Sequence, residues 1–315
     1  VARYQTNGLL DTAFNTGGTR IVQVANSDNG AMAASVQTDG SLVVAGSANT
    51  GTWDFASLRF YSNGILDTAF NTDGKATIAI GVGEDRAFNI ASSTDGSTVL
   101  AGFGNNGADE DFAAIRLDAS GNLETSFHTD GKLIASITPA VTDIAFSVKV
   151  RTDSSIVLGG FSDNTTNNDF AMMRLLPSGT LDTSFHTDGK NREDLGGEDE
   201  ANSIMMPEDG YLLMAGFAGS DFGIARYNAD GSIAESGTLD LSFGTNGSIL
   251  LPHATVAALY ATTVQTNGLL LSVGYGVGPD SADGDFLVWR VQPDGNVDTS
   301  FSTDGLVGIA LSTGT

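Results

Sequence analysis

Cysteine is absent from this 315-residue chain, and other marks of common protein classes are also scarce or missing. The absence of cysteine excludes disulfides, thiolate metal sites and cysteine nucleophiles. Basic residues number only 14 against 38 acids, so the formal net charge is −24 and binding to nucleic acid is not expected. No apolar run reaches the roughly 18 residues that span a bilayer, so we expect no membrane insertion.

Helical periodicity and proline are scarce as well. No window longer than a turn shows sustained apolar spacing of a helix, and six prolines stand against 40 glycines. Ser, Thr, Asn, Asp and Gly dominate the polar residues, a balance typical of turn-rich β proteins that are often secreted or surface-exposed. The composition therefore predicts an all-β protein, and we expect it to be extracellular or at the cell surface.

What the chain does contain is a tandem repeat. A single arginine recurs at spacings of 52 to 64 residues, and in five copies it ends a stretch that begins with Asp-Phe. A repeat of this length, with four short strands per copy and Asp-Gly hairpin turns, is the pattern of a β-propeller blade. A short motif accompanies the arginine as LDTAFNTGGT (10–19), LDTAFNTDGK (66–75), LETSFHTDGK (123–132), LDTSFHTDGK (181–190), LDLSFGTNGS (239–248) and VDTSFSTDGL (297–306).

The strands of one copy can be assigned within 75–118. There KATIAI, RAFNIASST, STVLAGFG and DFAAIRLD predict four antiparallel strands, which leaves single strands at 1–5 and 306–313 at the chain ends. We therefore predict one propeller over 1–315 with six blades, the last formed by both chain ends; five blades are the alternative. The predicted repeat units are 19–74, 75–131, 132–189, 190–247 and 248–305, and 1–18 and 306–315 contribute to the closing blade.

The closing blade lacks its middle hairpin in this arrangement. The chain opens on VARYQ, in the middle of a repeat, so we expect the natural protein to extend upstream and to supply the hairpin. In the alternative, a neighbouring molecule donates it, because unpaired strand edges recruit strands, and the protein self-associates.

The arginine and the motif are interpreted as architecture. The motif position of His128 and His186 holds Asn, Gly or Ser in other copies, so these imidazoles are not catalytic groups that the repeat requires. An acid follows the arginine by eight residues in most copies, and we expect it to bond the guanidinium. The phenylalanine of the motif is expected to pack between adjacent blades. The predicted structural residues are Arg59, Arg116, Arg174, Arg226, Arg290, Phe70, Phe127, Phe185 and Phe243.

The combined pattern, DFAxxRxxxxGxLDxSFxTDGK followed by an apolar strand and an acidic turn, resembles the bacterial delta-60 repeats. The resemblance covers essentially the whole chain. It implies a tandem-repeat β-propeller of unknown function, and it implies no activity and no catalytic residues.

Catalytic motifs are missing: there is no HExxH, no GxSxG and no phosphate-binding loop, and we predict no catalytic residue. Oxygen-rich loops are better candidates, because calcium takes six to eight oxygen ligands from such loops. None has the spacing of an EF-hand, so solvated turns with Asx hydrogen bonds are the alternative. Calcium is thus the one cofactor considered. Its candidate ligands are Asp280, Asp283 and Asp285, and then Asp163, Asn164 and Asp169.

One copy departs from the pattern of the repeat. Where other copies have an apolar strand after the motif, the fourth reads NREDLGGEDE (191–200). Such departures tend to mark function or strain, so Arg192, Glu193 and Asp194 are candidate contacts for a ligand or partner at the central channel. A frayed, solvated strand is the alternative. Trp53 is a further candidate contact, for example to sugar, whereas Trp289 is expected in the core.

These observations predict a non-catalytic propeller that acts as a scaffold or interaction module for a protein or glycan partner. Two alternatives stay open. The protein could be a structural subunit of a surface layer or filament, or a polysaccharide lyase or hydrolase that uses channel carboxylates.

Overall fold

The computed structural model describes the chain apart from residues 26–27, 208–209, 229–236, 252–255, 278–284 and 310–315. The described residues form five antiparallel sheets of four strands each, and their only helical element is the 3-10 turn η1 (Phe70–Thr72). No helix among them has the length and apolar character needed to cross a membrane. The chain divides into two compact units: unit 1 comprises Val1–Ser136, Thr152–Ser154 and Pro177–Thr180, and unit 2 comprises Ile137–Arg151, Ser155–Leu176 and Leu181–Thr315.

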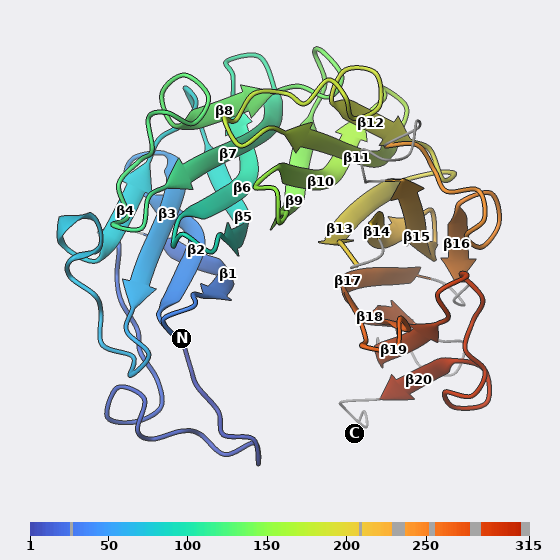
Figure 1. Ribbon diagram of the computed structural model, residues 1–315, viewed down its shortest axis with the longest axis horizontal. Coiled ribbons are helices and arrows are strands. Elements are labelled where there is room, and N and C mark those ends of the chain that lie inside the picture. Colours follow the sequence, from blue (N-terminus) through green and yellow to red (C-terminus); the bar gives the residue numbers. More distant parts are fainter. Residues whose placement is uncertain (26–27, 208–209, 229–236, 252–255, 278–284, 310–315) are drawn as a thin grey trace. The chain divides into compact units, whose positions relative to one another are not determined.

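Unit 1 holds two sheets, drawn in blue to green in Figure 1. In each sheet three long strands are followed by a short fourth one, and β5 packs on the first three strands of the preceding sheet. A core that includes Phe55, Phe70, Leu100 and Ile115 fills the space between the two sheets. The strands are β1 (Asn29–Val36), β2 (Leu42–Asn49), β3 (Trp53–Phe60) and β4 (Lys75–Ile78), and then β5 (Asp85–Ser92), β6 (Thr98–Asn105), β7 (Glu110–Leu117) and β8 (Lys132–Ala135).

Unit 2 holds three sheets of the same order, and its cores lie between successive sheets. Trp289 lies in one of them, edge-on to Phe222 with ring centroids 6.4 Å apart, as expected for a core residue. The strands are β9 (Asp143–Val150), β10 (Ile156–Asp163), β11 (Asn168–Leu175) and β12 (Lys190–Glu193), then β13 (Asp199–Met205), β14 (Tyr211–Ala218), β15 (Asp221–Asn228) and β16 (Ser248–Leu251), then β17 (Val256–Val264), β18 (Leu270–Val277), β19 (Asp285–Val291) and β20 (Leu306–Ile309).

The short strand pairs with the strand before the motif, which corrects the predicted grouping. The expectation joined 75–80 to the hairpin after it, whereas β4 pairs with β3 and places Ile78 opposite Phe55. The reason is local: the N–H of Asp67 donates to the carbonyl of Arg59, and the N–H of Arg59 donates to the carbonyl of Gly74. These bonds return the chain to the strand that it has just left.

The same pairing overturns the predicted closing blade. β20 pairs with β19 and completes the fifth sheet, so it does not share a sheet with residues 1–5. Those residues form only isolated bridges, Ala2 with Thr19 and Tyr4 with Leu10. The described part of the chain therefore has five blades, and the prediction of six is wrong.

Within the motif, the arginine and the acid form a clamp. Arg59 donates from Nε to Oδ2 of Asp67 at 2.7 Å, and its guanidinium lies over the ring of Phe70, 4.9 Å from the centroid. Its Nη1 donates to the carbonyl of Ala119 in the next copy, so one side chain ties two copies together. The equivalent ion pairs are Arg3–Asp11, Arg116–Glu124, Arg174–Asp182, Arg226–Asp240 and Arg290–Asp298.

The motif phenylalanine is buried against the following copy. A Cβ added to Gly121 would lie 2.5 Å from the ring of Phe70, and one added to Gly179 would lie 2.8 Å from the ring of Phe127. The ring therefore occupies the space that a side chain of the next turn would need. In four of the six motifs the ring is at most 1% exposed, as Phe70, Phe127, Phe185 and Phe243, whereas Phe14 is 3% exposed and Phe301 is half-buried.

The histidine position is kept for its backbone conformation. His128 and His186 have φ values of 54° and 52°, in the left-handed region that Asn and Gly adopt most readily. Asn71, Gly244 and Ser302 adopt positive φ at the same motif position. The exchange of side chains there is thus explained without a chemical role for the imidazoles.

Each first strand also carries a β-bulge that requires a glycine opposite it. In the second sheet the register shifts between Ala87 and Asn89, and a Cβ on Gly102 would lie 1.7 Å from the carbonyl oxygen of Arg86. This close approach of two backbones explains the glycine in VLAGF. The equivalent glycines are Gly46, Gly160, Gly216 and Gly274.

Candidate functional site

Asp169 begins the candidate site, near the start of β11. Its side chain is 3% exposed, and its Oδ2 accepts a hydrogen bond from Nδ2 of Asn164 at 2.9 Å and forms an ion pair with Nε of Arg192 at 3.2 Å. Its Oδ1 is buried and has no hydrogen-bond partner among the described residues. One half of the carboxylate is thus fixed, and the other half is unused.

Asp199, the first residue of β13, is fully buried. Its Oδ2 accepts the N–H groups of Leu195 at 2.7 Å and Gly196 at 3.1 Å, which belong to the turn after β12. Asp85 and Asp143 accept the equivalent N–H groups in their own copies, so this capping is a feature of the repeat. The Oδ1 of Asp199 has no partner in the described part of the chain.

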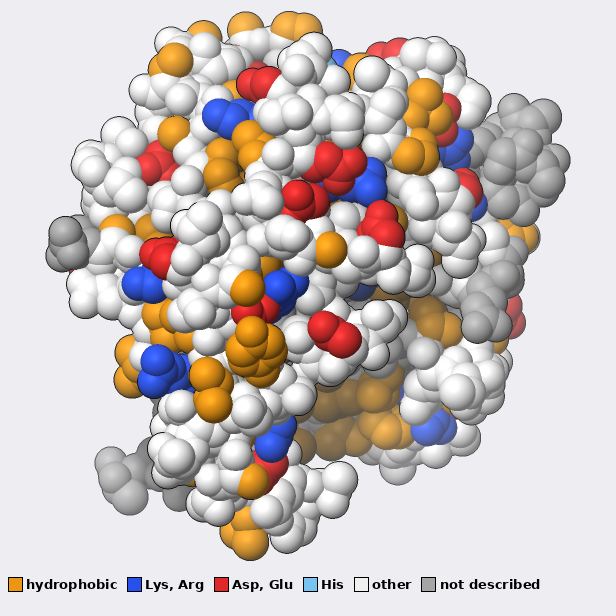
Figure 2. Space-filling view, turned by 60° about the vertical axis from the view of Figure 1, so that its left-hand side comes forward, with side chains coloured by type: hydrophobic (Ala, Val, Ile, Leu, Met, Phe, Trp, Pro, Cys, Tyr) orange, Lys and Arg blue, Asp and Glu red, His pale blue; other side chains and the backbone are white. Residues whose placement is uncertain are grey.

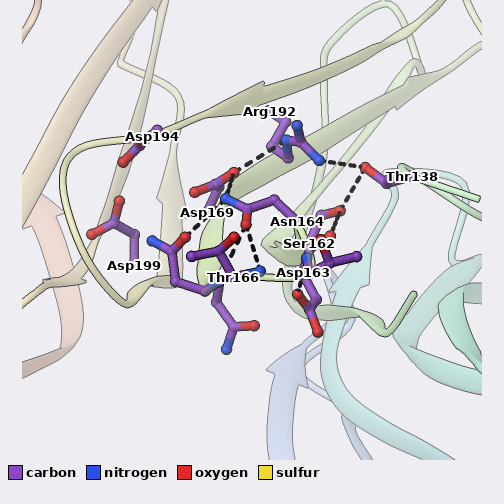
Figure 3. Close-up of polar contacts among 12 residues, drawn as sticks. Thr138, Ser162, Asp163, Asn164, Thr166, Asp169, Arg192, Asp194 and Asp199 are labelled. Atoms are coloured by element: carbon purple, nitrogen blue, oxygen red, sulfur yellow. Dashed lines mark hydrogen bonds and ion pairs between the residues drawn. The ribbon is translucent and has the colours of Figure 1, made fainter.

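Asp194 adds a third carboxylate, which the other copies described at this position lack. It is exposed, and its Oδ1 accepts the N–H of Gly196 at 2.8 Å. One carboxylate oxygen each from Asp169, Asp194 and Asp199 lie within 4.8 Å of one another, and Figure 3 shows the three groups facing a common space. We call these three residues the acidic site.

Arg192 borders the acidic site on one side. Besides its ion pair with Asp169, it donates from Nη1 to Oγ1 of Thr138 at 2.8 Å, and Ser162 donates to the same hydroxyl at 3.0 Å (Figure 3). The guanidinium therefore neutralises Asp169 on the side away from Asp194 and Asp199.

The electrostatics of the site are those of crowded carboxyl groups. Burial raises the pKa of Asp199 to about 6; the N–H groups of the 195–196 turn oppose this shift, and the charges of Asp194 and Asp169 add to it. Burial also raises the pKa of Glu193, with further increases from Asp194 and Asp169. A bound cation would relieve the repulsion, because it favours the charged form of each carboxyl group.

Overall charge would not have singled out this site. On the face drawn in Figure 2, Asp and Glu side chains are interspersed with Lys and Arg among uncharged ones. The acidic site is distinguished by the convergence of buried oxygens, which follows from the geometry of β11, β13 and the turn between β12 and β13.

The structure brings together only some of the residues that the sequence indicated. Asp194 and Asp169, from two separate predictions, converge, with Arg192 beside them. Asp163 accepts the N–H of Thr165 at 2.5 Å, as in an Asx turn, and Asn164 presents its amide nitrogen to Asp169. The predicted set of Asp163, Asn164 and Asp169 therefore does not present its oxygens to one point in this conformation.

The other predicted contacts lie elsewhere. Asp280 and Asp283 are outside the described residues, whereas Asp285 is a half-buried residue at the start of β19. Trp53 belongs to unit 1, where the guanidinium of Arg86 lies over its ring, 4.4 Å from the centroid.

Sequence reasoning did not identify Asp199. A signal was present, because an acid recurs as the first residue of three bulged strands, as Asp85, Asp143 and Asp199. The role of this recurring acid as a turn cap becomes visible only when the N–H groups that it accepts are known.

Comparison with known proteins agrees with the repeat. Five stretches, which together exceed half of the chain, match the family described as "Domain of unknown function (DUF5122) beta-propeller": residues 37–70, 94–127, 152–185, 208–233 and 266–301. This match confirms a tandem-repeat β-propeller, and the narrower delta-60 identification stays a prediction. No curated protein matches the chain.

Solved structures with similar folds are distant in sequence. An apocarotenoid oxygenase from Synechocystis is 11% identical, with 98% of this chain and 67% of that chain covered and a TM-score of 0.49. The Dos1 propeller is 11% identical, with coverages of 94% and 60% and a TM-score of 0.48. An endo-arabinase from Bacteroides thetaiotaomicron is 13% identical, with coverages of 87% and 98% and a TM-score of 0.42. Likenesses at this level carry no argument about activity.

Proposed function

Since the chain belongs to the DUF5122 beta-propeller family, a domain of unknown function, we propose that it is a non-catalytic binding module. The sheets and their arginine clamps are the scaffold, and the acidic site with Arg192 is the contact for a ligand. We place this module outside the cell or at its surface, on the strength of its acidic, cysteine-free, turn-rich composition.

One coincidence carries the proposal: among the described residues, the copy that breaks the repeat is also the one in which three carboxylates converge. Residues 192–194 read Arg-Glu-Asp where the preceding copy, at 134–136, reads Ile-Ala-Ser. Crowded carboxylates cost stability unless they are compensated. A pure scaffold gains nothing from them, so their presence favours a role in binding.

A glycan fits the chemistry of this surface. Exposed Asp194 accepts hydrogen bonds from hydroxyl groups, and Arg192, with 37% of its side chain exposed, donates them. Paired donors and acceptors of this kind match the hydroxyl groups of a polysaccharide. A protein partner is the alternative outcome of the same test.

The test uses a repeat-matched variant in which Arg192→Ile, Glu193→Ala and Asp194→Ser reproduce the residue types of 134–136. We expect the unaltered chain to bind at least one polysaccharide of a diverse panel, and the variant to bind it at least tenfold more weakly, a difference of about 1.4 kcal/mol. Asp188→Ser is the control, because Asp188 is also exposed and also accepts the N–H of the residue two positions on. Equal binding by all three proteins would refute a role for the acidic site.

The enzyme alternative has one observation in its favour. Oxygens of Asp194 and Asp199 lie within 4.8 Å, and retaining glycosidases hold their two carboxyl groups about 5–5.5 Å apart. The same polysaccharides should therefore be assayed for new reducing ends and for unsaturated ends, the products of hydrolases and lyases. Turnover that is lost in Asp194→Ser and kept in Asp188→Ser would replace the binding proposal with an enzymatic one.

Assembly into a surface layer or filament is a third role for the same scaffold. Sedimentation velocity over a wide range of concentrations tests it. A monomer throughout the range argues against assembly, whereas growth of ordered oligomers would make the structural role primary.

A further inference from the structure

We infer that Asp169, Asp194 and Asp199 bind one divalent cation, of the class of calcium. This inference rests on the proposed function and deepens it, because it names the ion through which the acidic site holds a hydroxyl-rich ligand. The sequence placed calcium in other residue sets, and the structure points to this one instead.

The spacing of the three carboxylates suits such an ion. One oxygen from each residue lies within 4.8 Å of the others. Calcium binds oxygen at about 2.3–2.6 Å, so two ligands of one ion are at most about 5 Å apart. The three groups are therefore close enough for one ion to contact all of them after at most a small adjustment of the side chains.

Unused oxygens provide a second, independent observation. The Oδ1 atoms of Asp169 and Asp199 are buried and have no hydrogen-bond partner in the described part of the chain. A buried carboxylate oxygen without a partner is costly, and a ligand supplies the missing interaction. In the first copy Oδ1 of the equivalent Asp85 accepts the N–H of Asn105 at 3.1 Å.

Asp111 shows why the third carboxylate matters. It is the equivalent of Asp169 in another copy, and its Oδ1 also has no partner among the described residues. The position of Asp194 is Ser136 in that copy, so one carboxylate fewer is present there. Unused oxygens thus recur in the repeat, and Asp194 is the addition that makes a candidate ligand set.

The remaining bonds hold the ligands in place. Oδ2 of Asp169 is fixed by Asn164 and Arg192, and Oδ2 of Asp199 is fixed by the N–H groups of the 195–196 turn. Such outer contacts orient carboxylates that bind metal. Arg192 lies on the far side of Asp169, where it lowers the negative charge of the site and does not occupy Oδ1.

Three carboxylate oxygens fill only part of a calcium shell, which holds six to eight. The open positions would be taken by water or by hydroxyl groups of the ligand. Asp194 is exposed, so these positions face solvent. The cation would thereby link the buried pair of carboxylates to a polysaccharide at the surface.

The experiment is a calorimetric titration of calcium chloride into chelator-treated protein. We expect one site in the unaltered chain and in Asp188→Ser, and affinity that is at least about tenfold weaker in Asp194→Ser. Asp194→Ser should fold, because serine occupies the equivalent position 136. Asp194→Asn, which keeps the side-chain shape, is a second variant. Calcium should also raise the thermal midpoint of the unaltered chain and not that of either Asp194 variant.

Two results would overturn the inference. One is no binding by the unaltered chain up to about 10 mM calcium, a concentration tenfold above the dissociation constant of the weakest extracellular calcium modules. The other is equal binding of calcium by the Asp194 variants.

Polysaccharide binding measured with calcium and with chelator separates this inference from the proposed function. Calcium binding without any polysaccharide binding defeats only the proposed function. If polysaccharide binding is the same with calcium and with chelator, and the titration shows no heat of calcium binding, only the cation site is refuted.

Discussion

Unit 1 and unit 2 can be compared at three equivalent positions of the repeat. These positions hold Asp54, Ala79 and Asp85 in unit 1 and Asp169, Asp194 and Asp199 in unit 2. In unit 1 the hydroxyl groups of Thr50 and Thr52 donate to Asp54, and Asp85 uses both oxygens to cap backbone N–H groups. In unit 2 both acids keep an oxygen without a partner among the described residues, and a third acid faces them.

In our proposal, this difference is the step by which a structural repeat acquires a binding site. The repeat already supplies two buried acids, one of which caps a turn, so the scaffold provides most of the ligand set. A change from a small residue to aspartate at one position, with arginine and glutamate before it, then converts a capped turn into a candidate ligand set. If this is right, substitutions in the shared architecture and substitutions in the added site should have separate effects.

The largest effect is expected from the motif phenylalanine, which both regions share. Phe70→Ala in unit 1 and Phe185→Ala in unit 2 should each lower the free energy of unfolding by about 3–5 kcal/mol, because each ring is fully buried. Urea unfolding followed by tryptophan fluorescence checks this. Trp53 reports on unit 1 and Trp289 on unit 2, and single Trp→Phe backgrounds separate the two signals. Met32→Ala, at a residue 55% exposed, is the control. A loss confined to one unit would show that the copies are not equivalent in packing.

A smaller effect should distinguish two arginines of unit 2. Arg174→Ala should cost about 3 kcal/mol, because Arg174 is 6% exposed and its loss leaves Asp182 without its cation. Arg192→Ala should cost less, about 1 kcal/mol, because that side chain is 37% exposed and Asp169 keeps its hydrogen bond from Asn164. The midpoint of chemical unfolding gives both values. Similar losses of unfolding free energy in the two variants would mean that Arg192 is a structural residue.

Much of this architecture could be predicted from sequence, because it depends on contacts that are local or repeated. The eight-residue spacing from Arg59 to Asp67 indicated an ion pair, and the structure places Nε 2.7 Å from the carboxylate. The grouping of strands was not predictable in the same way. A repeat has no marked beginning, so the pattern of residues 75–78 fits equally well before or after the motif, and only the bond from Arg59 to Gly74 decides.

The acidic site was predicted in pieces and not as a whole. Asp169 and Asp194 were each conspicuous in sequence, but they were assigned to different features of the chain. Asp199 joins them because the turn after β12 folds back onto the start of β13, which depends on the N–H groups of Leu195 and Gly196. Convergence of three side chains from two sheets depends on packing, which no local pattern records.

Acid should weaken the clamp between Arg174 and Asp182 only at low pH. Burial alone would raise the pKa of Asp182, but hydrogen bonds from Ser184 and the charge of Arg174 outweigh it, so the pKa lies below its ordinary value of 3.8. A depressed pKa contributes stability that is present above the unfolded value and is lost as pH falls through the folded value. The stability difference between the unaltered chain and Asp182→Asn should therefore shrink below about pH 4. Urea midpoints between pH 7 and pH 3 test this, and a difference that is constant across the range would contradict it.

The smallest effect on stability is expected where the largest effect on binding is proposed. In chelator, the repeat-matched variant at 192–194 should unfold within about 1 kcal/mol of the unaltered chain, since it removes exposed or half-exposed polar groups and adopts the residues of 134–136. Removal of the Asp194 charge also relieves repulsion at Asp199, which favours the variant. Addition of calcium should then stabilise only the unaltered chain. The unaltered chain should therefore become the more stable of the two proteins, or exceed the variant by a larger margin than in chelator. If the variant loses more than about 3 kcal/mol of unfolding free energy in chelator, Arg192, Glu193 and Asp194 are structural residues. Unit 1 and unit 2 would then differ at these positions in their packing and not in a binding site.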